Sequence, residues 1–270
     1  MDAPTDYAAK KRVLFSRLSE LRSVAVAFSG GVDSGVLLHA ALLVLGDRCS
    51  AVIADSASLP RRELAEAQAF AAQIGAQLQI ARTDELDNPA YRANAGDRCY
   101  HCKSALFARM EPWAAERGFH ALAFGEITDD RLDDRPGARA AGEFGVVAPL
   151  AESGFTKDDV RRYAREAGLV LADKPASACL ASRIPVNTEV TAERLAQVEA
   201  AEDSLRSLGL AVLRVRHHGH SAQVELGAEE HGRLAELESE LTQRLVACGF
   251  EHVEFARYWS PTERATGLAH

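Results

Sequence analysis

The stretch Ser23-Val-Ala-Val-Ala-Phe-Ser-Gly-Gly-Val-Asp-Ser34 runs almost directly into the apolar segment Val36-Leu-Leu-His-Ala-Ala-Leu-Leu-Val-Leu45. An apolar run that stops at a glycine pair before a longer apolar segment indicates a buried strand, a tight turn and a helix. The order recurs, because Cys49–Ala54 predicts a strand before a helix at 60–74, and Gln77–Ala81 predicts a third strand. Strands with so few polar residues have no face that is suited to contact with solvent. The pattern therefore predicts an α/β fold with a parallel sheet covered by helices on both sides.

The chain divides into two predicted domains, residues 1–187 and 188–270. In the first we also expect helices at 7–21, 103–117 and 157–167 and a strand at 120–124. The polar stretch Asp129–Gly142 predicts a long loop over an active site. The second is expected to be a small α+β domain for substrate binding or oligomerisation, with helices at 191–208 and 229–247 and strands at 212–216, 222–226 and 252–255.

Composition limits the classes of protein that this chain can represent. Its 270 residues, 47% of them hydrophobic, can bury one large core and a smaller second one. The formal net charge of −8 lacks the broad positive field of nonspecific nucleic-acid binding, so no nucleic-acid partner is expected. The sequence contains no basic-then-apolar leader and no apolar run of about 18 residues, and we expect a cytoplasmic protein without a membrane partner.

Ser29-Gly-Gly-Val-Asp-Ser34, here called the phosphate loop, lies where the free N–H groups of the following helix face the turn. Gly30 and Gly31 allow the backbone to approach phosphate oxygens, and Ser29 and Ser34 offer hydroxyl groups. Asp33 either holds Mg²⁺ or caps the helix. The lysine of a Walker motif is missing, so this is a different kind of phosphate-binding turn.

Five cysteines, an odd number, argue against a disulfide framework and favour thiol or metal chemistry. Cys99 and Cys102 are expected in a loop that enters a helix, where they are a redox pair, half of a zinc site or two inert thiols. Cys179 lies in the proline-bounded segment Lys174–Pro185, either as an accessible thiol or as a small apolar filler. Cys49 and Cys248 stand in apolar contexts and are expected in the core.

The phosphate loop resembles the PP-loop of the ATP pyrophosphatases, which cleave ATP between the α and β phosphates and leave AMP on the substrate. In that superfamily the end of the second strand, here near Ala54, lies beside the adenine. Nearly the whole chain resembles the LarE family of ATP-dependent sulfur transferases, which build the nickel-pincer nucleotide cofactor. The resemblance rests on Ser29–Ser34, Asp97–Phe107, Asp129-Asp130 with Arg135–Gly137, Pro149-Leu150, Lys174–Pro185, Arg214-Val-Arg216 and His218-Gly219. One departure is Gly125-Glu-Ile127, where the family tends to have Gly-Thr-Asn.

The resemblance implies that ATP adenylates a carboxylate of a pyridinium dicarboxylate mononucleotide and that a cysteine sulfur, from Cys179, then displaces AMP. In members that rely on this residue alone, the thiocarboxylate product leaves dehydroalanine behind. Members with three cysteines bind a [4Fe-4S] cluster that carries an extra sulfide. The matching positions here are Cys99, Cys102 and Cys179, and we favour this variant because all three are present.

Further contacts follow from the same resemblance. Mg²⁺ on the phosphates would have Asp33 and Asp130 as ligands. The nucleotide substrate would meet residues of the second half of the chain, with arginines for its phosphate: Arg183, Glu202, Arg214 and Arg216. The family also implies a homo-oligomer.

Two other functions share parts of this sequence pattern. A PP-loop tRNA thiolation enzyme would use the same adenylation and thiol chemistry on RNA, and the acidic charge disfavours it. A non-catalytic ATP-binding sensor would use the loop alone and would release no pyrophosphate.

Overall fold

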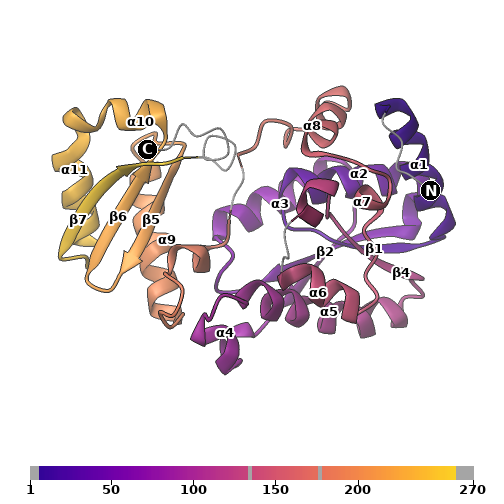
Figure 1. The fold of residues 1–270 in the computed structure, drawn as a ribbon, viewed down its shortest axis with the longest axis horizontal. Helices are drawn as coiled ribbons and strands as arrows, with labels where there is room; N and C mark the ends of the chain where they lie inside the picture. Colours follow the sequence, from indigo (N-terminus) through magenta and orange to yellow (C-terminus); the bar gives the residue numbers. More distant parts are fainter. Residues whose placement is uncertain (1–5, 133–135, 176–177, 260–270) are drawn as a thin grey trace. The chain divides into compact units, whose positions relative to one another are not determined.

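The protein is described by a computed structural model, which covers residues 6–132, 136–175 and 178–259 (Figure 1). Within these residues the chain forms two compact units. The first consists of residues up to 91 together with 96–175, and the second consists of residues 92–95 together with those from 178 onward. Arg135, one of the residues that carry the resemblance, lies outside the described ranges.

A four-stranded sheet organises the first unit. Its strands are β1 Val24–Ala27, β2 Cys49–Asp55, β3 Leu78–Arg82 and β4 Ala121–Phe124, in the order β3-β2-β1-β4. All three strand pairs are parallel, and Val26 is in register with Ala51 on one side and with Ala123 on the other. The predicted parallel sheet is thereby confirmed. Because parallel strands end at the same edge, the residues that follow β1 and β4 become neighbours there.

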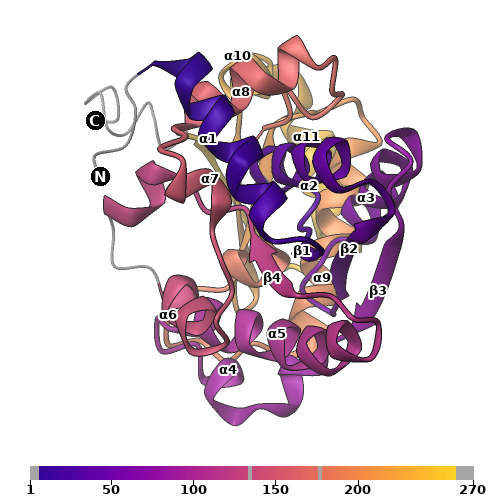
Figure 2. The ribbon, with the colours of Figure 1, turned by 90° about the vertical axis from the view of Figure 1, so that its right-hand side faces the viewer.

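Helices cover both faces of this sheet (Figure 2). One face carries α1 Tyr7–Glu20, α2 Val32–Leu45, α3 Arg61–Gln73 and α8 Lys157–Glu166, and the other carries α5 Arg98–Glu116 and α6 Pro136–Glu143. The strand β1 shows why its sequence is uniformly apolar. Val24 and Val26 pack into the cluster on the first face, whereas Ala25 packs into the cluster on the second.

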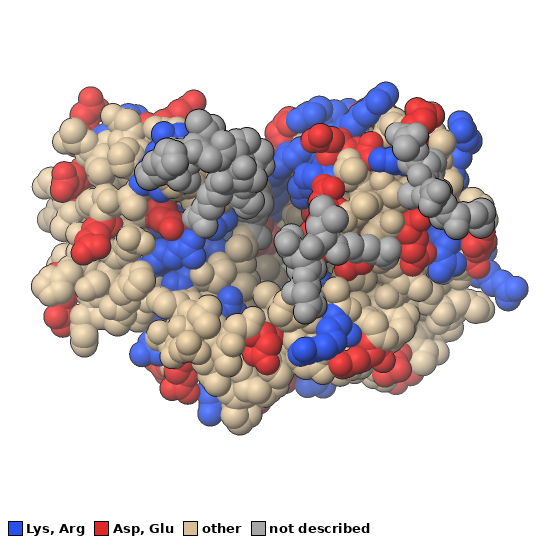
Figure 3. Space-filling model, viewed as in Figure 1, with Lys and Arg blue, Asp and Glu red and all other residues tan. Residues whose placement is uncertain are grey.

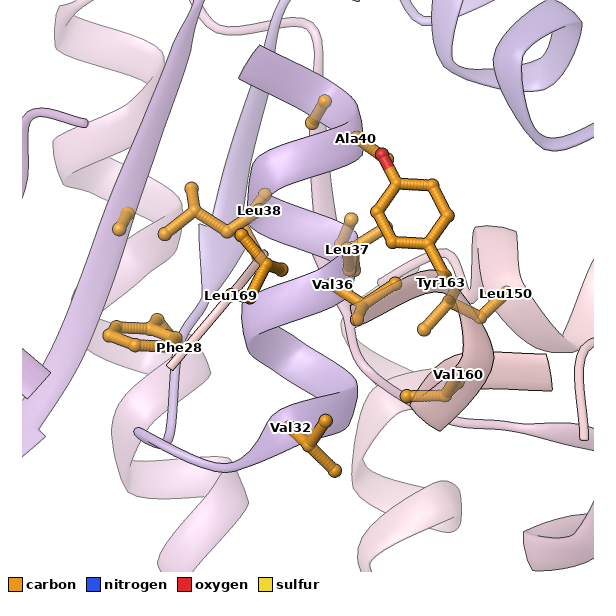
Figure 4. Packing of buried hydrophobic residues seen from close by; sticks show 14 of the residues in the cluster. Phe28, Val32, Val36, Leu37, Leu38, Ala40, Leu150, Val160, Tyr163 and Leu169 are labelled. Carbon is orange, nitrogen blue, oxygen red and sulfur yellow. The ribbon is translucent and has the colours of Figure 1, made fainter. Parts of the chain in front are cut away.

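Charged side chains of both signs lie on the surface of each unit (Figure 3), and the interior is mainly apolar. The helix α2 is at the centre of the main core, with Val36, Leu37 and Leu38 each 1% exposed or less (Figure 4). Tyr163 of α8 packs against this helix. Burial of most of the helix explains why the segment after the phosphate loop has almost no polar positions, and it fixes the start of α2.

The stretch 129–142 is not the long loop that the sequence predicts. It contains the 3-10 helix η3 Thr128–Leu132 and most of the helix α6 Pro136–Glu143. Ala140 and Ala141 of α6 are buried against α5, which explains how a segment with few large apolar residues still forms a packed helix. Two further short helices, α4 Pro89–Ala93 and α7 Pro149–Glu152, were also not predicted.

The second unit is an α+β structure built on a three-stranded sheet. Its elements are α9 Ala192–Arg206, β5 Leu213–His218, β6 Ser221–Leu226, α10 Ala228–Gly232, α11 Leu234–Ala247 and β7 His252–Arg257. The strands β5 and β6 are antiparallel, and β6 and β7 are parallel. The single helix expected at 229–247 is two helices that are interrupted at Arg233, after a glycine that weakens the helix. Among the described residues, no helix has the length and apolar character needed to cross a membrane.

Candidate active site

The phosphate loop connects β1 to α2 and leaves helical N–H donors unfilled. Gly31 is the N-cap of α2 in an extended conformation, and no side chain caps this helix end. The Ser34 hydroxyl donates to the Gly31 carbonyl at 3.2 Å and accepts from the Ser29 N–H at 3.1 Å, while the two serine hydroxyls lie 3.0 Å apart. The serines thus close the turn, and the free donors with the positive end of the helix dipole suit an anion.

The loop is held between the end of β4 and the helix α3. A Cβ atom added to Gly125, which follows β4, would lie only 2.6 Å from the Ser34 backbone nitrogen. On the other side, a Cβ added to Gly30 would lie 3.3 Å from the Ala67 Cβ atom of α3. Gly30 also has a φ of 76°, a conformation that glycine adopts without strain. Both glycines are therefore required by the backbone geometry of the loop.

Asp33 does not cap the helix. Both of its carboxylate oxygens accept hydrogen bonds from the Lys157 ammonium group at 2.8 Å. Lys157 is the first residue of α8, whose N-terminus is fixed by the Thr156 capping box and by Asp129, which accepts from the Lys157 N–H at 2.7 Å. Sequence reasoning missed Lys157. Its position directly after the Thr156 N-cap was the only available signal.

The predicted Mg²⁺ ligands are carboxylates of the first unit. Asp33 points to Lys157, and the Asp130 carboxylate accepts a hydrogen bond from the Ile127 N–H at 3.3 Å. Carboxylate oxygens together with phosphate oxygens are the donor set that Mg²⁺ prefers, so these residues fit the ion chemically. Ala54, expected near the adenine, lies close to the end of β2 and is partly exposed.

Cys99 and Cys102 lie inside the helix α5. The sequence had predicted them in a loop before this helix, and that prediction is wrong. The helix begins at Arg98, so the two cysteines occupy its first turns on one face. Cys99 is exposed, and Cys102 is partly buried with its Sγ atom 4.0 Å from Glu85 Oε1. Two thiols on one helical face are suited to bind a common metal centre.

The partly buried side chain of Lys103 brings an ammonium group near these thiols. This group lies 4.5 Å from the centre of the Phe124 ring at the end of β4. Burial lowers the pKa of Lys103, and the nearby groups Glu126, Cys99, Asp130 and Cys102 act in the opposite direction. This lysine, which sequence reasoning also missed, places a positive charge between the cysteine pair and the carboxyl edge of the sheet.

Cys179 belongs to the second unit, where its backbone is bonded to Arg183, one of the predicted substrate contacts. Cys179 is partly exposed and immediately precedes the 3-10 helix η4 Leu180–Arg183. The Arg183 guanidinium donates to the carbonyl groups of Ala178 at 2.6 Å and Cys179 at 3.2 Å. It also donates to Glu202 at 2.8 Å, and both partners of this ion pair are almost fully buried. Arg183 therefore fixes the shape of the segment that carries the thiol.

Glu202 lies behind this segment and connects it to the small sheet. Its side chain accepts hydrogen bonds from Arg183, from Arg206 and from the Val215 N–H of β5. Because Glu202 is only 4% exposed, its observed role is to orient the arginines. A contact with substrate stays a prediction for this residue.

Arg214 and Arg216 extend from β5 and form a basic cluster with Arg183. Arg216 donates to the Ser182 carbonyl at 3.0 Å and to Glu225 at 2.9 Å. Arg214 lies over the Tyr258 ring at 4.4 Å, and its pKa is lowered by burial, with Arg183 and Arg216 contributing. Figure 3 shows blue side chains gathered on this unit. Guanidinium groups bind phosphate oxygens well, although Arg183 and Arg216 are paired with Glu202 and Glu225 here.

The remaining cysteines are Cys49 and Cys248, one of them buried and the other partly buried. Cys49 is 2% exposed, and burial raises its pKa to about 12. Burial also raises the pKa of Cys248. Across the described ranges, no three or more cysteine, histidine, aspartate or glutamate side chains gather in a way that could hold a metal ion.

The parallel sheet in the order β3-β2-β1-β4, with an uncapped Ser-Gly-Gly-Val-Asp-Ser turn at the start of α2, defines a PP-loop α/β protein. No family model matches the chain. It is 38% identical over 247 residues to the pyridinium-3,5-bisthiocarboxylic acid mononucleotide synthase of Lactiplantibacillus plantarum, an alignment that covers 91% of this chain and 90% of that protein. The chain therefore belongs to the LarE family of sulfur transferases.

Two uncharacterized proteins align over a similar length. One from Synechocystis sp. is 41% identical over 236 residues, covering 87% of this chain and 88% of that protein. One from Methanocaldococcus jannaschii is 26% identical over 232 residues, covering 86% of this chain and 88% of that protein. The similarity thus extends across both units of the fold in each case.

Proposed function

We propose that this protein is an ATP-dependent sulfur transferase that converts a carboxylate of pyridinium-3,5-dicarboxylic acid mononucleotide into a thiocarboxylate. The observation that carries the proposal is the 38% identity, over 91% of the chain, to a synthase named for the bisthiocarboxylic acid product. A synthase of that product must replace an oxygen atom of each of two carboxylates by sulfur. The phosphate loop and Cys179 supply the two chemical capabilities that this exchange needs.

The first step is activation of the carboxylate. A carboxylate is anionic and resonance-stabilised, so it accepts a nucleophile poorly until its oxygen has become part of a good leaving group. Its oxygen attacks the α-phosphorus of ATP, and pyrophosphate leaves with the electrons of the broken P–O bond. The free N–H groups at the start of α2 would bind the phosphates, and the Lys157 ammonium group would transfer from Asp33 to the developing charge.

Mg²⁺, when bound, would neutralise part of the phosphate charge. Asp33 and Asp130 would be its protein ligands. In this arrangement Asp33 exchanges Lys157 for the metal ion, so that the carboxylate and the ammonium group both acquire partners of opposite charge.

The second step delivers sulfur to the acyl-adenylate. The Cys179 thiolate attacks the acyl carbon, and AMP leaves with the electron pair of the C–O bond, which gives a thioester. Removal of the cysteine α-proton and cleavage of the Cβ–S bond release the thiocarboxylate and leave dehydroalanine. Arg183 supports this step by holding the carbonyl groups of Ala178 and Cys179, which fixes the backbone on both sides of the sulfur.

A catalytic variant would take its sulfur from a metal centre. The residues Cys99, Cys102 and Cys179 would hold a [4Fe-4S] cluster, which would supply an inorganic sulfide. We favour this variant because all three cysteines are present and Cys99 and Cys102 share one face of α5.

The substrate phosphate would bind to Arg183, Arg214 and Arg216 of the second unit. Glu202 would act by orienting Arg183 and by holding the Val215 N–H, which lies between Arg214 and Arg216 on β5. We further propose that the protein acts in the cytoplasm on this small nucleotide as a homo-oligomer, in line with the family resemblance. No nucleic acid or membrane takes part.

The test is an anaerobic reaction of the protein with MgATP and the dicarboxylate nucleotide. Substrate-dependent release of pyrophosphate and a thiocarboxylate product are expected. Cys179→Ala should retain pyrophosphate release and lose the thiocarboxylate, whereas Cys248→Ala, which removes another partly buried thiol, should retain both. Absence of pyrophosphate release with this substrate, or release that depends on tRNA instead, would contradict the proposal.

Intact mass separates the two sulfur sources. One product per chain, together with loss of H₂S at Cys179, supports sulfur from the protein. Several products per chain, lost in Cys99→Ala together with the iron–sulfur absorption band, support the cluster.

A further inference from the structure

Lys174 contacts the phosphate loop from the segment that precedes Cys179. Its ammonium group donates to the Gly30 carbonyl at 3.2 Å and forms ion pairs with Glu63 at 2.7 Å and Glu66 at 2.9 Å. The Lys174 side chain is 13% exposed and that of Glu63 is 6% exposed. These three acceptors use all three N–H bonds of the ammonium group, so its position is fixed.

The bond to the Gly30 carbonyl determines where the next N–H group points. In a planar trans peptide the carbonyl and the following N–H are directed to opposite sides, so a fixed Gly30 carbonyl fixes the Gly31 N–H. This N–H belongs to the N-cap of α2 and is one of the donors that a bound phosphate would use. Its contact inside the loop is a long one, 3.4 Å to the Ser29 hydroxyl.

A peptide between two glycines is especially free to rotate, so its orientation has to be fixed by contacts from outside the loop. Gly30 has a φ of 76°, and glycine occupies both signs of φ at similar cost, so this peptide can rotate and turn its N–H away from a phosphate. The helix α3 lies against the loop through Ala67, and it presents the carboxylate oxygens of Glu63 and Glu66 to Lys174. Lys174 brings a positive charge that binds these oxygens and the Gly30 carbonyl together.

We propose that Lys174 is a positioning residue that holds the Gly30–Gly31 peptide in its phosphate-binding orientation and thereby determines the affinity for the triphosphate. The inference rests on the proposed function, because it requires ATP at the phosphate loop. Lys174 acts through the loop and need not touch the nucleotide. Substitution of Lys174 would therefore leave the binding of the adenosine part of ATP unchanged.

The test compares nucleotide affinities by isothermal titration calorimetry. Lys174→Met is expected to weaken MgATP binding about tenfold and to leave adenosine binding unchanged, since only the phosphates use the loop. Lys174→Arg keeps the charge and the donors and should bind MgATP within about threefold of the wild type. An equal loss for ATP and adenosine, or no loss for ATP, would overturn the proposal.

Lys10→Met is the matched control. Lys10 forms an ion pair of similar burial with Asp159 in the same unit, at 2.6 Å and with side chains 11% and 14% exposed. This variant should lose stability to a similar extent and keep its MgATP affinity. If it weakens MgATP binding as much as Lys174→Met does, the effect is a general loss of stability and the proposal is wrong.

A second variant covers the case in which Lys174→Met does not fold. The double variant Glu63→Gln, Lys174→Met also neutralises the buried carboxylate that loses its lysine partner in the single variant, and it should show the same selective loss of MgATP affinity. Wild-type affinity in this variant would overturn the inference. Wild-type protein that fails to bind MgATP would contradict the proposed function itself, which separates the two failures.

Discussion

The ammonium group of Lys157 lies 2.8 Å from both carboxylate oxygens of Asp33, although 124 residues separate the two in the sequence. The pair stands at the N-terminus of α2, where a Walker motif would supply a lysine of its own. The structure thus provides a lysine for the phosphate loop from the start of another helix, α8.

Replacing Lys157 by Met is expected to lower the rate of pyrophosphate release about 100-fold, which is the usual cost of removing one donor to developing charge. A coupled assay for pyrophosphate measures it. Lys11→Met is the control, because Lys11 has nearly the same side-chain exposure as Lys157 and also forms an ion pair, with Glu166, far along the chain. Similar rates in the two variants would show that Lys157 has no special role.

Gly125→Ala is expected to displace the phosphate loop. The added Cβ atom would lie 2.6 Å from the Ser34 nitrogen and 2.8 Å from its Cα atom, and neither backbone atom can move without shifting the start of α2. Overpacking of this kind costs about 1–3 kcal/mol of the free energy of unfolding. We expect a lower melting temperature and a loss of MgATP affinity of about tenfold, since the loop supplies the phosphate donors.

Gly142→Ala supplies the comparison for that variant. Gly142 lies within the helix α6, and an added Cβ atom there would have no neighbour within 4 Å. Because alanine is the better helix former, this substitution should leave MgATP binding unchanged and stabilise the protein slightly. Melting curves with and without MgATP distinguish the two glycines. Equal behaviour of both would mean that the contact between β4 and α2 is unimportant.

Much of the first unit could be predicted because its strands are apolar and its turns contain glycine. The pattern from Ser23 to Leu45 was enough to predict β1, the phosphate loop and α2, since burial on both faces leaves a continuous apolar sequence. The helix α6 could not be predicted in the same way. It is stabilised by small alanines packed against α5, and alanine and glycine give no clear periodic signal.

The partners of the site residues were hidden from sequence for a different reason. Lys157 and Asp33 meet because two helices begin at the same edge of one sheet, which is a property of the topology. The start of α5 was also placed too late. Arg98 and Cys99 precede the apolar part of that helix, so its polar first turn looked like a loop. Contacts between distant segments need the fold to be known first.

The pair of Lys10 and Asp159 should make stability depend on acid pH. Burial raises the pKa of the Asp159 carboxyl, but the hydrogen bonds from Lys10 and Thr156 outweigh it and hold the pKa below its ordinary value of 3.8. A carboxyl with a lowered pKa in the folded state stabilises the protein fully above 3.8, and this contribution is lost as the pH falls through the folded-state pKa.

We therefore expect Asp159→Asn to destabilise the protein by about 1 kcal/mol at pH 7, by loss of the cap and the ion pair. The difference from the wild type should shrink as the pH falls below 3.8. Urea denaturation over a pH series measures this. Asp158→Asn removes the same charge from an exposed side chain in the same helical turn and should cost little at any pH. A pH-independent difference for Asp159→Asn would refute the assignment.

The five cysteines should differ in their reactivity in a way that separates the functional thiols from the core. Cys49 is 2% exposed and burial raises its pKa to about 12, so at pH 8 only roughly one molecule in ten thousand carries the reactive thiolate. Cys99 is exposed on the first turn of α5.

Iodoacetamide under anaerobic, metal-free conditions should therefore modify Cys99 first and spare Cys49, and peptide mass mapping would show this. Protein unfolded in urea should be labelled at all five cysteines. Rapid labelling of Cys49 in the folded protein would show that the core opens at β2. Protection of Cys99 after iron and sulfide are added, but not after MgATP alone, would show that this thiol has become a ligand.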